Sequence, residues 1–158
     1  MTLPETYQKL VAVQPGDDIR TACAVQEVKL EMPKPGDILV KTHYTGVNAA
    51  DYLMALGRYL SPTPPPYDMG AESVGVVVAI GDGVENLKVG DAILSLTDGG
   101  FRDYFHMKAR HAIPLPQASP EAVSLAISGL TASIALEHTG NMTSGETVLV
   151  TAAAGGTG

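Results

Sequence analysis

The sequence predicts a mainly β domain, a small barrel or sandwich, followed by the first helix and strand of a doubly wound α/β domain. Short apolar and β-branched runs, separated by Gly, Pro and Asp turns, fill residues 1 to about 116. A helix-start pattern then appears at Ser119-Pro120-Glu121. An apolar run at 147–150 leads directly into a glycine-rich segment. We therefore expect two units, 1–117 and 118–158.

The β-rich unit contains a series of candidate strands, each closed by a turn signal. They are residues 9–13, 23–30, 38–45, 74–80, 92–96, 101–107 and 112–115. Proline, glycine and aspartate clusters separate them, as at 33–37 and 81–83. Residues 48–56 interrupt the pattern and predict a short helix. Asn48 is its expected cap, and Asp51 is at the third position, where a carboxylate favours a helix N-terminus.

The second unit begins with an apolar-rich stretch, 121–139. This stretch predicts a long helix, either continuous or broken near Gly129. Gly140 is a typical helix stop. A strand is expected at 147–152, followed by a turn of the kind whose backbone N–H groups face a pyrophosphate. Compared with the pattern G-x-G-x-x-G, the chain has Ala153, Gly155 and Gly158, so the first glycine is replaced.

Composition limits the possible partners of the chain. A net charge of −7 over 158 residues, without a basic cluster, argues against nucleic acid or an anionic membrane as a partner. No apolar run is long enough to span a bilayer, and the N-terminus lacks a secretory signal pattern. Cys23 is the single cysteine, which excludes an internal disulfide and suggests a reducing compartment. We expect the cytoplasm, or alternatively an organelle matrix.

Short motifs occur along the chain in the order found in a known enzyme family. They are 35–40, 45–51, 57–59, 70–75, 88–91, 129–132 and 152–158. In this respect the sequence resembles the zinc-independent quinone oxidoreductase and prostaglandin reductase branch of the medium-chain dehydrogenase/reductase superfamily. The resemblance implies a GroES-like barrel as catalytic domain, then a Rossmann-type domain that binds NADPH. It also implies that this chain is the N-terminal part of such an enzyme, inactive by itself.

The resemblance also argues against a catalytic zinc. Zinc members hold the metal with a cysteine, a histidine and a later cysteine, and these positions correspond to Asn48, Ala71 and the neighbourhood of Ile127 and Ser128. Tetrahedral zinc sites need thiolate and imidazole donors. The histidines of this chain are scattered without ligand spacing. We therefore expect no metal.

Without zinc, the expected chemistry is reduction of a C=C bond conjugated to a carbonyl, or of a quinone. A hydride reaches the β-carbon, charge develops on the carbonyl oxygen, and a proton completes the reaction at the α-carbon. Asn48 is the first candidate to donate to that oxygen, although capping the helix is an equal alternative. Tyr52 and Tyr59 are candidate proton donors. Relatives place their tyrosine one or two positions after Tyr52, and Tyr59 has packing as its alternative role.

The resemblance further implies a set of cofactor-binding residues. They are Asn48, Asp51, Thr131, Ala153, Gly155, Gly156, Thr157 and Gly158. For Asp51 the alternative is a pure helix-terminus role, and for Thr131 it is a hydroxyl bonded to its own helix backbone. Glu72 is expected to be a buried structural carboxylate with a partner nearby.

We expect an NADPH-dependent enone or quinone reductase whose substrate is a small apolar carbonyl compound, such as an oxoprostaglandin or alkenal, or a quinone. The full-length form is expected to be a homodimer. Two alternatives stay open: a non-catalytic relative that keeps the fold as a binding or structural protein, and a natural short product that acts as a partner subunit.

Overall fold

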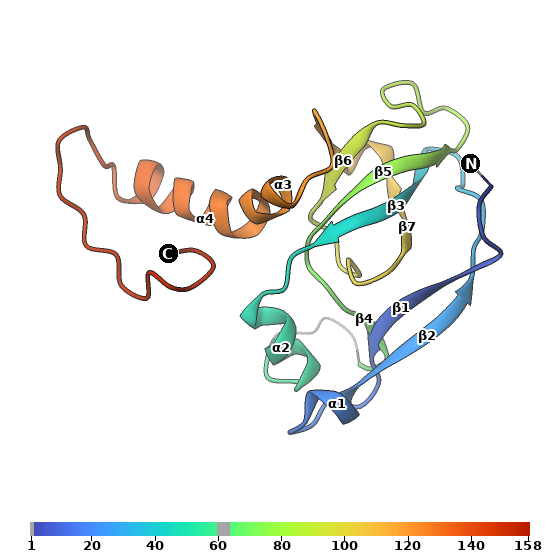
Figure 1. Cartoon of the computed structure of the whole chain (residues 1–158), viewed down its shortest axis with the longest axis horizontal. Helices are drawn as coiled ribbons and strands as arrows, with labels where there is room; N and C mark the ends of the chain where they lie inside the picture. Colours follow the sequence, from blue (N-terminus) through green and yellow to red (C-terminus); the bar gives the residue numbers. More distant parts are fainter. Residues whose placement is uncertain (1, 60–63) are drawn as a thin grey trace.

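Two antiparallel sheets form the body of the computed structural model, which describes residues 2–59 and 64–158 (Figure 1). The smaller sheet has the strand order β2-β1-β4, and the larger one has the order β7-β3-β5-β6-β8. The strands are β1 (Thr6–Ala12), β2 (Cys23–Lys29), β3 (Asp37–Thr45), β4 (Tyr67–Asp68), β5 (Ser73–Ile80), β6 (Ala92–Ser95), β7 (Tyr104–Lys108) and β8 (Ile113–Leu115). The mainly β architecture expected for this unit is therefore confirmed.

The predicted strands of the first unit are all present, with ends that move by no more than three residues. The sequence did not predict β4 or the short helix α1 (Ile19–Ala22). Both are short, so they carry little periodic signal. Strand β4 exists because it pairs with β1, which is distant in the chain.

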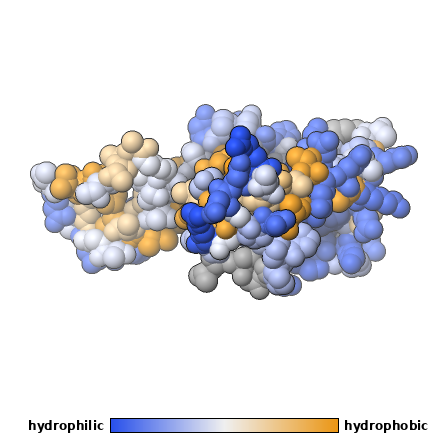
Figure 2. All heavy atoms as spheres, turned by 90° about the horizontal axis from the view of Figure 1, so that it is seen from below, coloured by the Kyte–Doolittle hydropathy of each residue, from blue (hydrophilic) through white to orange (hydrophobic). Residues whose placement is uncertain are grey.

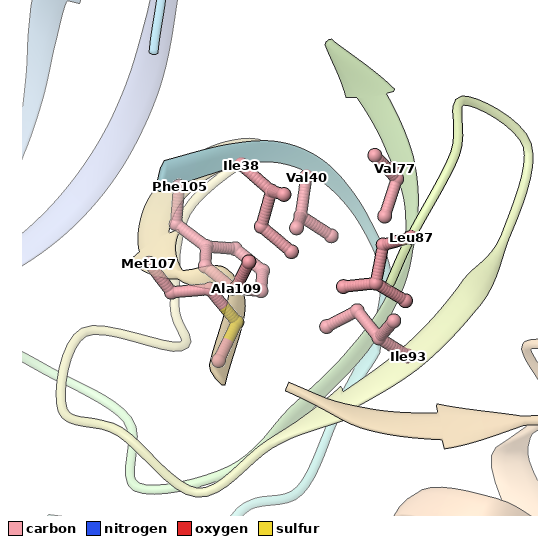
Figure 3. Packing of buried hydrophobic residues seen from close by; sticks show 8 residues of the cluster. All are labelled: Ile38, Val40, Val77, Leu87, Ile93, Phe105, Met107 and Ala109. Carbon is pink, nitrogen blue, oxygen red and sulfur yellow. The ribbon is translucent and has the colours of Figure 1, made fainter. Parts of the chain in front are cut away.

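The core of the larger sheet is built from alternate residues of its strands, because successive side chains of a strand point to opposite faces. Figure 3 shows this cluster between the curved strands. Its members are Ile38, Val40, Val77, Leu87, Ile93, Phe105, Met107 and Ala109. Strand β3 pairs with both β5 and β7, so both of its edges are hydrogen-bonded within the sheet. Its register with β5 shifts between Thr42 and Tyr44, close to where the strand ends.

Helix α2 (Ala49–Ala55) follows β3 and packs on the smaller sheet. Ala55 is fully buried with Ala12 of β1 and Met69, which follows β4. The phenol of Tyr67 also donates to the carbonyl oxygen of Met54, at 2.5 Å. These contacts fix the helix at one end of the barrel-like body.

A helical arm leaves the body after β8 (Figure 1). It runs without interruption from Pro120 to Thr139 as α3 (Pro120–Ser124), η2 (Leu125–Gly129), α4 (Leu130–Ser133) and η3 (Ile134–Thr139), where η2 and η3 have wide π-type turns. Ser119 caps the arm, since its Oγ accepts from the Ala122 N–H at 3.2 Å. Gly129 does not break it. Val123 and Ala126 pack on Val74 and Leu94 and attach the arm to the larger sheet.

The strand expected at 147–152 is not formed, and this is a correction to the sequence prediction. Residues 146–150 have no regular structure, and 151–156 form turns and bends. Leu149 is 90% exposed. A strand exists only through a hydrogen-bonded neighbour, and no described strand pairs with this segment. Figure 2 shows apolar atoms, in orange, at the end of the molecule that the arm and the segment after it form.

Within residues 2–59 and 64–158, none of the helices is both long enough and apolar enough to cross a bilayer.

Candidate active site

Asn48 begins the candidate site as the residue before helix α2. Strand β3 ends at Thr45, and Asn48 follows in an extended conformation. The Asn48 backbone N–H donates to Asp51 Oδ2 at 2.7 Å. Asp51 is the third residue of the helix, and its side chain accepts from the backbone N–H of the capping residue. This is the arrangement of a capping box. The expected helix-terminus role of Asp51 is confirmed, and the side chain is 3% exposed.

The Asn48 side chain is bonded to Glu72, which directly precedes β5. Its Nδ2 donates to Glu72 Oε1 at 2.9 Å. The second carboxylate oxygen, Oε2, accepts from the backbone N–H of Ile127 at 2.8 Å. An ionised carboxylate only accepts hydrogen bonds, so the amide nitrogen of Asn48 must face it. One of the two N–H bonds of that amide is thereby used, and its orientation is fixed.

The backbone around Glu72 is closely packed. Thr45 Oγ1 donates to the Glu72 carbonyl oxygen at 2.8 Å. A Cβ on Gly46 would overlap the Glu72 carboxylate, and one on Gly100 would lie 2.8 Å from the Glu72 carbonyl oxygen. Position 100 therefore needs glycine because a Cβ there would meet backbone, whereas a Cβ at Gly46 would push the Glu72 carboxylate aside. Glu72 is 3% exposed, so its side chain sits in a slot shaped by glycines.

Two buried carboxylates lie near each other in this site. Burial raises the pKa of Asp51 above its ordinary value, the Asn48 N–H lowers it, and the negative charge of Glu72 raises it further; the net pKa is raised. Within the described residues, neither carboxylate forms a salt bridge. The site is thus a buried, acidic, hydrogen-bonded centre.

The three positions that resemble zinc-ligand positions converge on Glu72. Asn48 and Ile127 donate to its carboxylate, and Ala71 is its neighbour in the chain. An amide that donates, a methyl group and a backbone N–H are not ligands for zinc, which takes thiolate, imidazole or carboxylate. This donor set does not fit a catalytic zinc. No group of three or more metal-binding side chains gathers elsewhere in the part of the chain that the structure describes.

The structure does not bring the tyrosines into the Glu72 centre. Tyr52 is on α2, one turn after Asn48, and is 49% exposed. Tyr59 follows the helix and is 51% exposed. The neighbouring Arg58 pairs with Asp17 at 2.5 Å on the surface. Both phenols are accessible to a bound molecule, and their role as proton donors stays a prediction.

Thr131 is in the arm, one helical turn after Ile127. Its hydroxyl donates to the Ile127 carbonyl oxygen at 2.6 Å. The backbone-bonded alternative for Thr131 is therefore present. The same bond connects Thr131 to the site, because the Ile127 N–H is held by Glu72. Contact of Thr131 with a cofactor stays a prediction.

The glycine segment lies beside the arm and lines a cavity of about 560 Å³. The Gly155 N–H donates to the Ala152 carbonyl oxygen at 2.8 Å and closes a turn. The cavity lining includes Ala132, Ala135, Leu136, 148–152 and 155–158. It contains no Lys or Arg, so contacts to a phosphate would come from backbone N–H groups. The glycine segment consists of small residues, and all residues from 140 to 158 are exposed.

The prediction that Glu72 is a buried structural carboxylate with a partner nearby is confirmed, whereas sequence reasoning missed the part that Ile127 plays in the site. A signal for Glu72 was available, since this acidic residue lies between Gly70 and Gly75 and directly precedes a mostly apolar strand. Its partner Ile127 contributes only a backbone N–H. A backbone group has no residue type, so no sequence pattern marks it.

Comparisons with known proteins agree with this architecture. Residues 34–117 match the family described as the alcohol dehydrogenase GroES-like domain. A "Probable quinone oxidoreductase" of Leishmania amazonensis is 41% identical over 160 residues, covering 100% of this chain and 47% of that protein. "Prostaglandin reductase-3" of Mus musculus is 39% identical, covering 99% of this chain and 42% of that protein. The chain thus spans less than half the length of these relatives.

Solved structures give the same result. The CurK enoyl reductase superimposes with a TM-score of 0.81 at 25% identity, covering 98% of this chain and 49% of that one. A mycobacterial protein solved with NADPH gives a TM-score of 0.74 at 29% identity, covering 96% of this chain and 47% of that one. This chain belongs to the alcohol dehydrogenase GroES-like domain family, within the medium-chain dehydrogenases/reductases, and groups with their quinone oxidoreductases and prostaglandin reductases.

Proposed function

We propose that this chain carries the catalytic domain of an NADPH-dependent reductase that acts on activated C=C bonds or quinones without zinc. The observation that carries the proposal is the Asn48 amide, held by Glu72 at the end of β3 in a site whose donors do not suit a metal. The names of the relatives support the same reaction class. Bound NADPH would supply the hydride.

The chain's own contribution is a fixed hydrogen-bond donor. The Asn48 amide has two N–H bonds, and Glu72 accepts one of them. The Asn48 side chain also interacts with the Asp51 carboxylate, and in the proposed reaction its second N–H donates to a substrate carbonyl oxygen. As the hydride adds to the β-carbon, the electron pair of the C=C bond moves toward that oxygen, and the N–H stabilises the developing negative charge. For a quinone, the same donor serves one of the two oxygens.

The reaction also needs a proton at the α-carbon, and two exposed tyrosines follow Asn48 in the chain. Tyr52 and Tyr59 are our candidate donors, and solvent water is the alternative. Tyr44, Val47 and Leu53, from the same stretch of the chain, are also exposed. An apolar surface of this kind suits a small apolar enone or quinone.

The cofactor part of the proposal involves the second unit, 118–158. Asn48, Asp51 and Thr131 would lie toward the nicotinamide end of NADPH. Backbone N–H groups from Ala153 to Gly158 would face the pyrophosphate, as in other glycine turns. We place the boundary of the catalytic unit at 117, next to the start of the arm. We further propose a homodimer in the cytoplasm for the full-length protein, which sedimentation and cell fractionation would test.

The test is reduction of an α,β-unsaturated ketone and of a quinone by the product of the complete gene, followed through consumption of NADPH. Asn48→Ala removes the donor, so kcat/KM should fall by about 100-fold. Asn86→Ala is the matched control, because Asn86 is an exposed asparagine in the β5–β6 connection. An Asn48→Ala protein as active as the unaltered one would contradict the assigned role. Absence of reduction by the unaltered protein would favour the non-catalytic alternative.

A further inference from the structure

The Glu72 carboxylate connects the barrel to the helical arm. It accepts from Asn48, at the start of α2, and from Ile127, in the arm. Residues 72 and 127 are separated by 55 positions in the chain. The bond therefore joins parts of the molecule that no strand pairing connects.

The bond to Ile127 lies within a part of the arm that has wide turns. An N–H inside a helix ordinarily donates to the carbonyl four residues earlier. Here the Ile127 N–H donates to a carboxylate, within the wide π-type turns of η2. Side chains that insert into the helix ladder widen or bend it. The Ile127 carbonyl is in turn bonded by the Thr131 hydroxyl, so the arrangement continues along the arm.

A buried carboxylate without a cation is costly to keep. Glu72 is 3% exposed, forms no salt bridge among the described residues, and lies near Asp51. Gly46 leaves the space for it, because a Cβ there would overlap its carboxylate. An apolar residue at position 72 would avoid the cost of the charge but would leave the two N–H donors unpaired.

From these contacts we infer that Glu72 is a positioning residue that holds the Asn48 amide, the turn at Ile127 and Thr131 as one unit. It orients the donor of the active site and couples that orientation to the arm that leads to the glycine segment. The catalytic part of this inference rests on the proposed function, whereas the structural part does not.

The structural part is tested by NMR on the 158-residue chain. The unaltered protein should show a scalar coupling across the hydrogen bond between the Ile127 amide nitrogen and the Glu72 carboxylate carbon. Its absence would overturn the inference. This measurement needs no variant, so it decides the structural part even if every substitution at position 72 prevents folding.

Hydrogen exchange supplies the matched variants. Gly46→Ala displaces the Glu72 carboxylate without changing its chemistry, so the Ile127 amide should exchange about tenfold faster or more. Gly16→Ala is the control, because a Cβ there meets only ordinary contact at 3.8 Å. The Val77 amide, in the β5 ladder, reports whether the sheet stays intact. Unchanged exchange at Ile127 in Gly46→Ala, with Val77 protected, would count against the inference.

The catalytic part is tested by combining two variants in the product of the complete gene. Glu72→Gln can itself donate a hydrogen bond, so it no longer dictates which way the Asn48 amide faces. We expect kcat to fall about tenfold or more while KM changes less than about threefold. Glu72→Gln added to Asn48→Ala should cause no further loss, because Glu72 acts through Asn48. Additive losses, or an unchanged kcat in Glu72→Gln, would refute this role.

These outcomes separate the two proposals. If the unaltered protein reduces neither enones nor quinones, the proposed function fails, and the NMR coupling still decides whether Glu72 joins the barrel and the arm. If reduction occurs but the two variants act additively, the function stands and the positioning role fails.

Discussion

Asp51 and Glu72 are buried acidic residues. Among the described residues, no basic side chain forms a salt bridge with either of them. What holds them is a set of N–H donors from the Asn48 backbone, the Asn48 amide and the Ile127 backbone. Such donors stabilise a carboxylate without removing the cost of burying its charge. Burial of Asp51 therefore makes stability depend on pH in a way that exposed acids do not.

The pH dependence of folding should show the raised pKa of Asp51. In the unfolded chain an aspartate ionises near pH 3.9, whereas burial makes ionisation harder in the folded chain. The contribution of Asp51 to stability is thus fully present below the unfolded pKa and is lost as the pH rises through the folded pKa. Asp51→Asn cannot ionise and can still accept from the Asn48 N–H. From pH 4 toward neutrality (about pH 7), the variant should gain stability relative to the unaltered protein.

Urea unfolding at several pH values measures this difference. Asp18→Asn is a control of opposite sign, because the Arg20 side chain lowers the pKa of Asp18. Stability from Asp18 is present above its unfolded pKa and lost as the pH falls through the folded one. The two variants should therefore deviate from the unaltered protein in opposite directions. Parallel pH curves for Asp51→Asn and the unaltered protein would refute the prediction.

At the residue level the sequence predicted what local spacing controls. Asn48 before the helix and Asp51 at its third position form the expected capping arrangement, because both lie within one helical turn. The bond between Glu72 and Ile127 was beyond such reasoning, since it spans 55 residues and one partner is a backbone group. A pattern in neighbouring residues carries no information about that distance.

At the level of elements, the arm depends on its start. Ser119 Oγ accepts from the Ala122 N–H, and Pro120 occupies the first turn, where its missing N–H is not needed. Ser119→Ala should lower the free energy of unfolding by about 1 kcal/mol. Ser144→Ala, in an exposed turn, should change it by less than about 0.5 kcal/mol. Equal effects of the two variants in urea unfolding would show that the cap does not stabilise the arm.

Elements were predictable to different degrees for a physical reason. Helix 120–139 formed as expected because its cap, its apolar face and its glycine stop are all local. The segment 147–150 has an equally clear strand composition, but a strand requires a partner, and none of the described strands pairs with it. Strand β4 is the converse case: two residues with no strand pattern are ordered by pairing with β1.

Hydrogen exchange should separate these elements directly. The amides of residues 147–150 lack ladder bonds and are exposed, so they should exchange at nearly the rate of an unstructured peptide. The amide of Val77 is bonded to the Asp91 carbonyl oxygen and buried, so it should be slower by about 1,000-fold or more. Protection of 147–150 comparable to that of Val77 would mean that this segment is paired in solution.

At the scale of the whole molecule, the body and the glycine segment differ in burial. The body has buried hydrophobic clusters, whereas Leu149 and Val150 beside the turn are exposed. A phosphate site of backbone N–H groups works only if those groups already point at the ligand, because ordering them on binding costs free energy. In the enzymes that use such turns, a paired strand and a following helix supply that order.

We therefore expect the 158-residue chain by itself to bind NADPH more weakly than about micromolar, and to catalyse little or no reduction. The 151–156 turns must be ordered on binding, at roughly 1–2 kcal/mol per residue, and no Lys or Arg lines the cavity to offset that cost. Titration calorimetry with NADPH measures the affinity, and Gly156→Ala should change it little, because the site is not preorganised. Micromolar binding that Gly156→Ala abolishes would mean that the turn is already in its binding conformation.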